Sequence, residues 1–123
     1  MTDKVRAFES GATRDKEEGK LDYEGFLSFP ALQRYALYMD SHRLQQDGKL
    51  RDSDNWQKGM PLNVYMKSMW RHLLSAWAIH RGFSIKDERD GHLVTIDEAL
   101  CGLLFNVFGY LHEILDVRKI EED

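Results

Sequence analysis

The chain is poor in cysteine and proline, and it has no long apolar run. Its single cysteine, Cys101, excludes an intrachain disulfide framework, and its apolar neighbours indicate a small core residue. No run reaches the roughly 20 apolar residues of a membrane span, and the N-terminus lacks an apolar signal-peptide core. We therefore expect a cytoplasmic protein with no membrane partner.

Positive charge is slightly outweighed by negative charge. The chain has 17 Lys and Arg residues against 21 Asp and Glu residues, which gives a net charge of −4. Because a basic face is needed to neutralise DNA or RNA phosphates, this balance argues against a nucleic-acid polymer as partner. A small nucleotide needs only a few local cations. No G-x-S-x-G, Walker or H-E-x-x-H motif is present, so the sequence identifies no catalytic residue.

Helical periodicity dominates the rest of the chain. We divide its 123 residues into an irregular, Gly-rich N-terminal arm (residues 1–25) and a helical domain (residues 26–123). Apolar spacing predicts three main helices, near residues 30–43, 63–81 and 95–117. The predicted fold class is therefore all-α, a small bundle of helices with long functional loops.

The last predicted helix is the clearest. Thr95 and Glu98 form a capping box at its start. Its apolar surface is too wide for one partner helix, which indicates a central helix or a subunit interface and predicts a homo-oligomer. Gly102 and Gly109 weaken this helix, so we expect another helix or a ligand to approach closely there, with Asn106 on the same face.

A loop followed by a helix carries the residues that most resemble a ligand site. Aromatic rings offer faces for stacking, and cations offer donors to phosphate. The candidate ligand-binding residues are Asn55, Trp56, Lys58, Ser68, Arg71 and His72, with Arg14 and Lys20 of the arm closing the site. The alternative is a polar helix face with a solvated histidine. The pairs His42-Arg43 and His80-Arg81 fit helix C-termini, where the helix dipole favours cations; phosphate contact is their alternative role.

A candidate metal site lies near the C-terminus. Glu113 and Asp116 are three residues apart, so both carboxylates reach one side of a helix and suit Mg²⁺. Hydrolysis of a triphosphate usually needs further carboxylates. These would come from Asp87, Glu88 or Asp90, or from a neighbouring subunit.

Several of these motifs together resemble a known family. They are Gly11-Ala12-x-Arg14, Gly19-Lys20, Asn55-Trp56-x-x-Gly59, Ser68-x-x-Arg71-His72, Gly82 and Asp90-Gly91. They resemble the bacteriophage family called dATP/dGTP diphosphohydrolase, N-terminal, over residues 11 to about 115. The resemblance implies a phage-encoded helical module that handles a purine nucleotide in the infected host cell. Some members are fused to MazG-type nucleotide pyrophosphohydrolase domains.

MazG-type catalysis uses Glu-x-x-Glu on one helix and Glu-x-x-Asp on the next to hold Mg²⁺. Glu113-x-x-Asp116 matches the second half, and no Glu-x-x-Glu precedes it on another helix. We therefore favour binding of a purine nucleotide or a nucleotide-derived signal, with anti-defence sequestration as its role. The alternatives are an Mg²⁺-dependent pyrophosphohydrolase acting on dGTP or dATP, and a phage interaction protein without a ligand.

Overall fold

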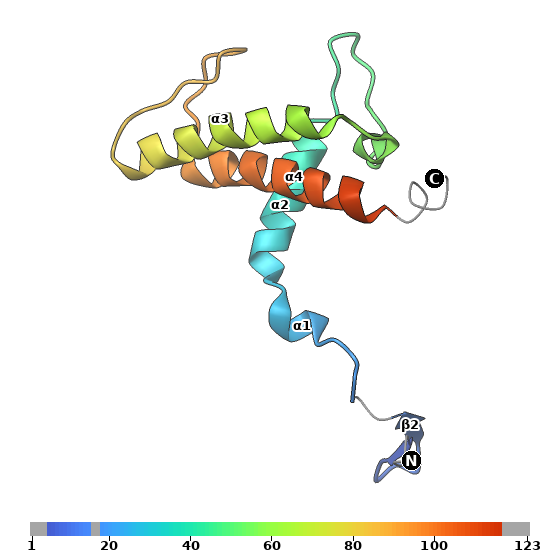
Figure 1. Ribbon diagram of the computed structural model, residues 1–123. Helices are drawn as coiled ribbons and strands as arrows, with labels where there is room; N and C mark the ends of the chain where they lie inside the picture. Colours follow the sequence, from blue (N-terminus) through green and yellow to red (C-terminus); the bar gives the residue numbers. More distant parts are fainter. Residues whose placement is uncertain (1–4, 16–17, 117–123) are drawn as a thin grey trace.

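The computed structural model describes residues 5–15 and 18–116, and this part of the chain is mainly helical (Figure 1). Two long helices lie side by side, a shorter one crosses them, and an extended N-terminal arm leads away from them (Figure 1). In chain order the elements are β1 (Val5–Ala7), β2 (Thr13–Asp15), α1 (Tyr23–Phe26), α2 (Phe29–Ser41), the 3-10 helix η1 (Asn55–Lys58), α3 (Leu62–His80) and α4 (Ile96–Leu115).

The helical part of the predicted fold is confirmed, but the chain is not strictly all-α. Strands β1 and β2 pair antiparallel, with Arg6 opposite Arg14. Gly11 lies in the connecting turn with φ of 92°, a backbone conformation that glycine adopts without steric cost. The amide of Phe8 donates to the Ala12 carbonyl at 2.9 Å across the same turn. The arm therefore contains a hairpin where we predicted irregular structure.

The predicted helix boundaries agree closely with the structure. Ser28 caps α2 by accepting a hydrogen bond from the Ala31 amide at 3.3 Å. Gly82, with φ of 94°, follows α3, and the Phe83 amide donates back to the Ala78 carbonyl at 2.9 Å. Thr95 caps α4 by accepting from the Glu98 amide at 3.3 Å. The last helix ends at Leu115, two residues before the predicted end, and residue 117 lies outside the described residues.

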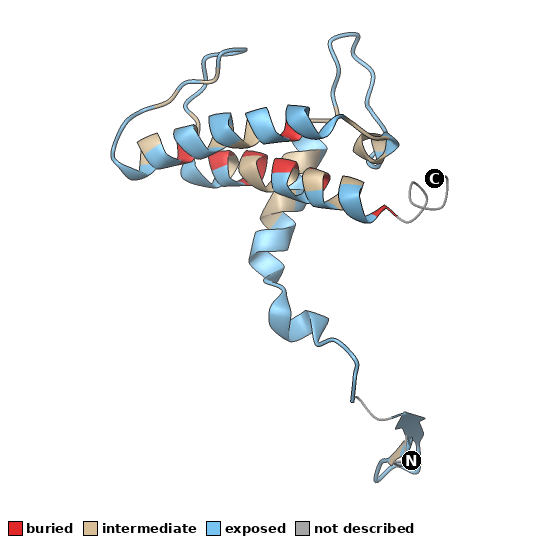
Figure 2. Ribbon diagram, viewed as in Figure 1, coloured by how far each residue is buried: buried red, intermediate tan, exposed pale blue. Residues whose placement is uncertain are grey.

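Helices α3 and α4 form an antiparallel hairpin that contains most of the core. Figure 2 shows the buried residues on the sides of these helices that face each other. A Cβ atom at Gly102 would overlap the His72 ring, and one at Gly109 would overlap the Tyr65 ring. Tyr65 is fully buried. The two glycines therefore allow the close helix contact that the sequence predicts.

Helix α2 packs on α4 rather than on α3. Arg34 Nε donates to Asp97 Oδ2 at 2.6 Å, and the rings of Tyr35 and Phe108 lie edge to face with centroids 5.7 Å apart. The opposite side of the α3–α4 hairpin has no helix against it within the described residues. By length and composition α4 is also apolar enough to cross a membrane, a criterion that core helices of soluble proteins also meet.

Candidate functional site

A cavity of about 430 Å³ lies between α2, η1, α3 and α4, and we call it the central cavity. Its size is typical of small-molecule sites. Five of the eight predicted ligand residues line it: Asn55, Trp56, Lys58, Ser68 and His72. Its other lining residues are Tyr38, Met39, His42, Arg43, Arg51, Asp52, Ser53, Gly59, Met60, Phe105 and Asn106. The predicted loop–helix site thus corresponds largely to one cavity.

The aromatic wall of the cavity is held by contacts to α4. The indole of Trp56 lies edge to face with Phe105 and with His112, at centroid distances of 6.3 and 4.8 Å. After η1 the chain turns at Gly59, whose φ of 108° suits glycine. The next amide, that of Met60, donates to Glu113 Oε1 at 3.3 Å. Glu113 therefore helps to fix the segment that carries Trp56.

A tight loop after α2 supplies two cations to the cavity. The Arg51 amide donates to the Arg43 carbonyl at 2.8 Å, and Arg43 Nε donates back to the Arg51 carbonyl at the same distance. These bonds set both residues beside the cavity. The sequence predicts Arg43 at a helix C-terminus and gives no reason to place Arg51 in the site, because the contact between the two depends on the fold of the loop.

Positive charge predominates in the lining of the central cavity, where Arg43, Arg51 and Lys58 lie with one carboxylate, Asp52. Arg43 is paired with Asp40 at 3.4 Å. Arg51 and Lys58 form no ion pair within residues 5–15 and 18–116. Because these two cations lie beside an aromatic wall, the cavity is suited to a ligand with both an anionic and a planar apolar part.

His72 and Asn106 form the helical wall of the cavity. Burial, aided by the positive charges of Arg71 and His42, lowers the pKa of His72. A neutral imidazole offers one donor and one acceptor. The Asn106 amide donates from Nδ2 to the Gly102 carbonyl at 2.8 Å. These two side chains can recognise polar edges of a ligand without adding net charge.

A second cavity, of about 460 Å³, adjoins the first, and we call it the arginine cavity. The two share Tyr38, His42 and Arg51. The rings of Tyr38 and His42 are stacked at 4.1 Å between centroids, and His42 Nδ1 donates to the Tyr38 carbonyl at 2.8 Å. Arg34 and Arg89 line the far part of this cavity. A ligand with an extended anionic tail could therefore reach from one cavity into the other.

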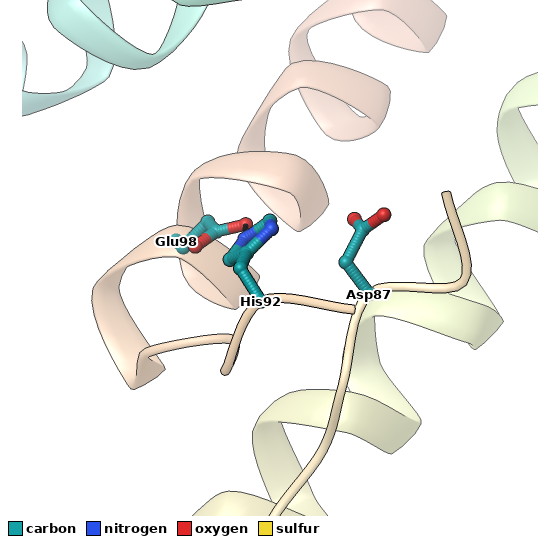
Figure 3. A group of neighbouring side chains, drawn as sticks. All are labelled: Asp87, His92 and Glu98. Atoms are coloured by element: carbon teal, nitrogen blue, oxygen red, sulfur yellow. Dashed lines mark hydrogen bonds and ion pairs between the residues drawn. The ribbon is translucent and has the colours of Figure 1, made fainter. Parts of the chain in front are cut away.

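Three potential metal ligands lie close together, and two of them, His92 and Glu98, line the arginine cavity. Their donor atoms, from Asp87, His92 and Glu98, all lie within 4.8 Å of one another. In Figure 3 the imidazole of His92 lies beside Glu98, with Asp87 on the loop next to it. His92 Nε2 contacts Glu98 Oε2 at 2.7 Å, and Asp87 is paired with Arg89 at 3.3 Å. We call these three residues the loop cluster.

The loop cluster was not predicted from the sequence. Glu98 was assigned to a capping box, and the structure confirms only the Thr95 half of that interpretation. The hairpin-like fold of the loop, with the Asp87 amide donating to the His92 carbonyl at 2.8 Å, brings the residues together. The spacing Asp-x₄-His-x₅-Glu is not a recognised metal motif, so the sequence alone does not predict a metal site at these residues.

Three predicted ligand residues lie outside the central cavity. Arg71 is exposed and does not line it, because adjacent helical residues point about 100° apart and its neighbour His72 faces the cavity. Arg14 and Lys20 line a separate cavity with Arg6. The arm that carries them leads away from α3 and α4 (Figure 1). The predicted closure of the site by the arm does not occur in this structure.

The predicted metal ligands Glu113 and Asp116 contact other protein groups in the structure. Glu113 accepts a hydrogen bond from the Met60 amide, and Asp116 is buried with Oδ2 3.9 Å from His112 Nε2. Asp87 cannot complete this pair, since it lies beside Glu98, and Glu98 and Glu113 are roughly 22 Å apart along α4. Within the described residues, only the loop cluster gathers three ligating side chains.

The chain matches no protein-family model, no curated protein and no solved structure.

Opposite pKa shifts are expected for two histidines of the site. Hydrogen bonds to Asp90 and Glu98 raise the pKa of His92, whereas burial lowers that of His72. On lowering the pH through about 6.5, the unfolded chain protonates His72 before the folded chain does, so this residue reduces stability toward acid. His92 stabilises the fold below that pH and loses its contribution as the pH rises through its raised pKa.

Long-range ¹H–¹⁵N NMR spectra recorded between about pH 5 and 8 resolve the two titrations. His72→Gln and His92→Gln variants assign the signals. Titration of His72 above His92 would contradict the described environments.

Proposed function

We propose that the central cavity binds a purine nucleotide or a nucleotide-derived signal. The planar base would lie against the wall formed by Trp56 and Phe105, and the phosphates would contact Arg51 and Lys58. The observation that carries this proposal is the pair of cations, Arg51 and Lys58, that form no ion pair within the described residues and lie beside an aromatic wall. Phosphate oxygens accept charge-assisted hydrogen bonds from such cations, and aromatic rings stack on bases.

The shape of the site supports a ligand with several phosphates. Arg51 lines both the central and the arginine cavity, and Arg34 and Arg89 add cations to the arginine cavity, which Asp90 and Glu98 also line. Both of these outer arginines are paired with aspartates, at 2.6 and 3.3 Å. They would therefore contribute less than Arg51 to phosphate binding, since each would have to share its donors.

Recognition of the base would fall to His72 and Asn106. Within the described residues Asn106 uses one amide hydrogen for the Gly102 carbonyl and keeps its acceptor oxygen for other partners. His72 is favoured in its neutral form by its lowered pKa. The resemblance to the phage dATP/dGTP diphosphohydrolase family favours a purine. In the cytoplasm of an infected cell, such a site would sequester a nucleotide-derived defence signal of the host.

A second candidate function is metal-dependent hydrolysis of dGTP or dATP. It is favoured by the loop cluster, two of whose residues line the arginine cavity, where phosphates of a bound nucleotide would lie. Asp87, His92 and Glu98 would hold a divalent ion, which would neutralise phosphate charge. One imidazole in the set suits Mn²⁺ or Zn²⁺ better than Mg²⁺, which prefers oxygen ligands.

Thermal-shift assays with a panel of nucleotides test the proposal. We expect purine deoxynucleoside triphosphates to raise the melting temperature more than the matching nucleosides, without added metal, because binding to the folded state stabilises it. Chromatography of the mixtures, with and without Mg²⁺ or Mn²⁺, detects turnover. Metal-dependent release of pyrophosphate would favour the hydrolase. No shift with any nucleotide would refute both functions and favour an interaction protein without a ligand.

A further inference from the structure

The α3–α4 hairpin has a broad apolar face that no described element covers. The face consists of Met66, Trp70, Leu73 and Trp77 of α3 and Ile96, Leu100, Leu103, Val107 and Ile114 of α4, and we call it the hairpin face. Along α3 its members are spaced by four, three and four residues. This is the spacing of a helical stripe that packs lengthwise on other helices.

Both stripes lie on the same side of the hairpin. Viewed along each helix from its N-terminus, the stripe lies about a third of a turn away from the residues that contact the other helix. The direction of this rotation is the same in α3 and α4. Two antiparallel helices are related by a two-fold axis perpendicular to the plane that contains them. Equal rotations in the same direction therefore place both stripes on the same side of the hairpin. Asp97 and Phe108, which contact α2, are displaced in the opposite sense. Figure 2 shows α2 crossing behind α4, with the near side of both helices uncovered.

The exposure of this face is unusual for a monomer. Trp70 is 67% exposed and Trp77 is 60% exposed. The chain has an accessible surface of 10327 Å², whereas a compact 14.4 kDa protein exposes roughly 6,800 Å². Part of the excess belongs to the extended arm. The hairpin face also contributes, because eight of its large apolar side chains are each 40–67% exposed.

We infer that a second copy of this chain covers the hairpin face, forming a four-helix bundle from two hairpins. The helices have nearly equal lengths of 19 and 20 residues, so two hairpin faces match along their full length. The face contains no charged residue, and a two-fold axis can therefore pair it with itself without like-charge repulsion. Stripes spaced by three and four residues pack at the shallow angles of four-helix bundles.

This dimer does not depend on the nucleotide proposal. The central and arginine cavities are formed with α2, which lies on the opposite side of α4 from the hairpin face. Both cavities of each copy would remain open in the dimer. Substitutions that break the interface should therefore lower the mass of the protein in solution and leave the residues of both cavities in place.

Sedimentation equilibrium over a concentration series tests the inference. We expect the wild type to have twice the chain mass of 14.4 kDa at micromolar concentration. The substitutions Trp70→Glu and Val107→Glu should shift it to the monomer mass, since each places a charge in the apolar interface. Leu37→Glu is the matched control, because Leu37 is 61% exposed on α2, outside the hairpin face.

The wild-type series decides the outcome even where a variant fails to fold. A monomer mass at all concentrations would overturn the inference, as would a dimer that persists in folded Trp70→Glu or dissociates in Leu37→Glu. Flotation with phosphatidylcholine vesicles tests the alternative occupant. Binding of a monomeric wild type to these vesicles would assign the face to a lipid surface instead.

Discussion

Replacing Gly109 by alanine is expected to lower the free energy of unfolding by about 1–3 kcal/mol. In an ordinary helix this change would be favourable by roughly 1 kcal/mol, because alanine is the better helix former. Here the new methyl group would overlap the ring of Tyr65, which is fully buried and cannot move into solvent. The cost of moving a packed aromatic ring should exceed the gain in helix propensity. Urea unfolding of both proteins at equal concentration measures the difference.

A second background shows whether the contact is responsible. Tyr65→Leu removes the ring atoms that a methyl group on residue 109 would meet. In that background Gly109→Ala should be neutral or stabilising, so the two substitutions should be non-additive by at least about 1 kcal/mol. A stabilising effect of Gly109→Ala in the wild-type background would contradict the close packing of α3 and α4.

The helices were predictable because their signals are local. Caps at Ser28 and Thr95, the glycine after α3, and apolar spacing of three and four residues depend only on near neighbours in the sequence. The helix contact at Gly102 and Gly109 was also predictable, since a glycine in a helix interior needs compensation. The β-hairpin of the arm was missed, because strands of three residues are too short to show a period.

The site was predictable only in part. Asn55, Trp56 and Lys58 are close in sequence to one another, and Ser68 and His72 are four residues apart on one helix face, so their grouping follows from local geometry. Arg71 was included for its proximity in sequence, although a single residue step turns a helical side chain away from its neighbour. The structure places it outside the cavity lining.

The remaining site residues depend on contacts between distant segments. Arg51 reaches the cavity through backbone bonds with Arg43, and Asn106 comes from α4. The loop cluster joins residues of a polar loop to the first turn of α4. No helical or strand period links such positions, so a single sequence gives no reason to group them.

Removing Arg51 and Lys58, the two cavity cations that form no ion pair within the described residues, should weaken nucleotide binding severely. A charge-assisted hydrogen bond contributes about 1.5–3 kcal/mol, so Arg51→Ala combined with Lys58→Ala should raise Kd by roughly two to four orders of magnitude. The effect should grow with the number of phosphates and should be small for the nucleoside, which offers no anionic oxygens. Competition experiments against the wild type measure the ratio of the Kd values.

Calorimetric titration of the purified protein with dATP and dGTP tests the proposed binding most directly. The wild type should bind one of them saturably, the Arg51→Ala Lys58→Ala variant should show little heat at the same concentrations, and Arg81→Ala should bind as the wild type does. Arg81 is a suitable control because it is exposed at the end of α3 and lines none of the described cavities. Equal binding by all three proteins, or no binding by the wild type, would contradict a nucleotide site in the central cavity.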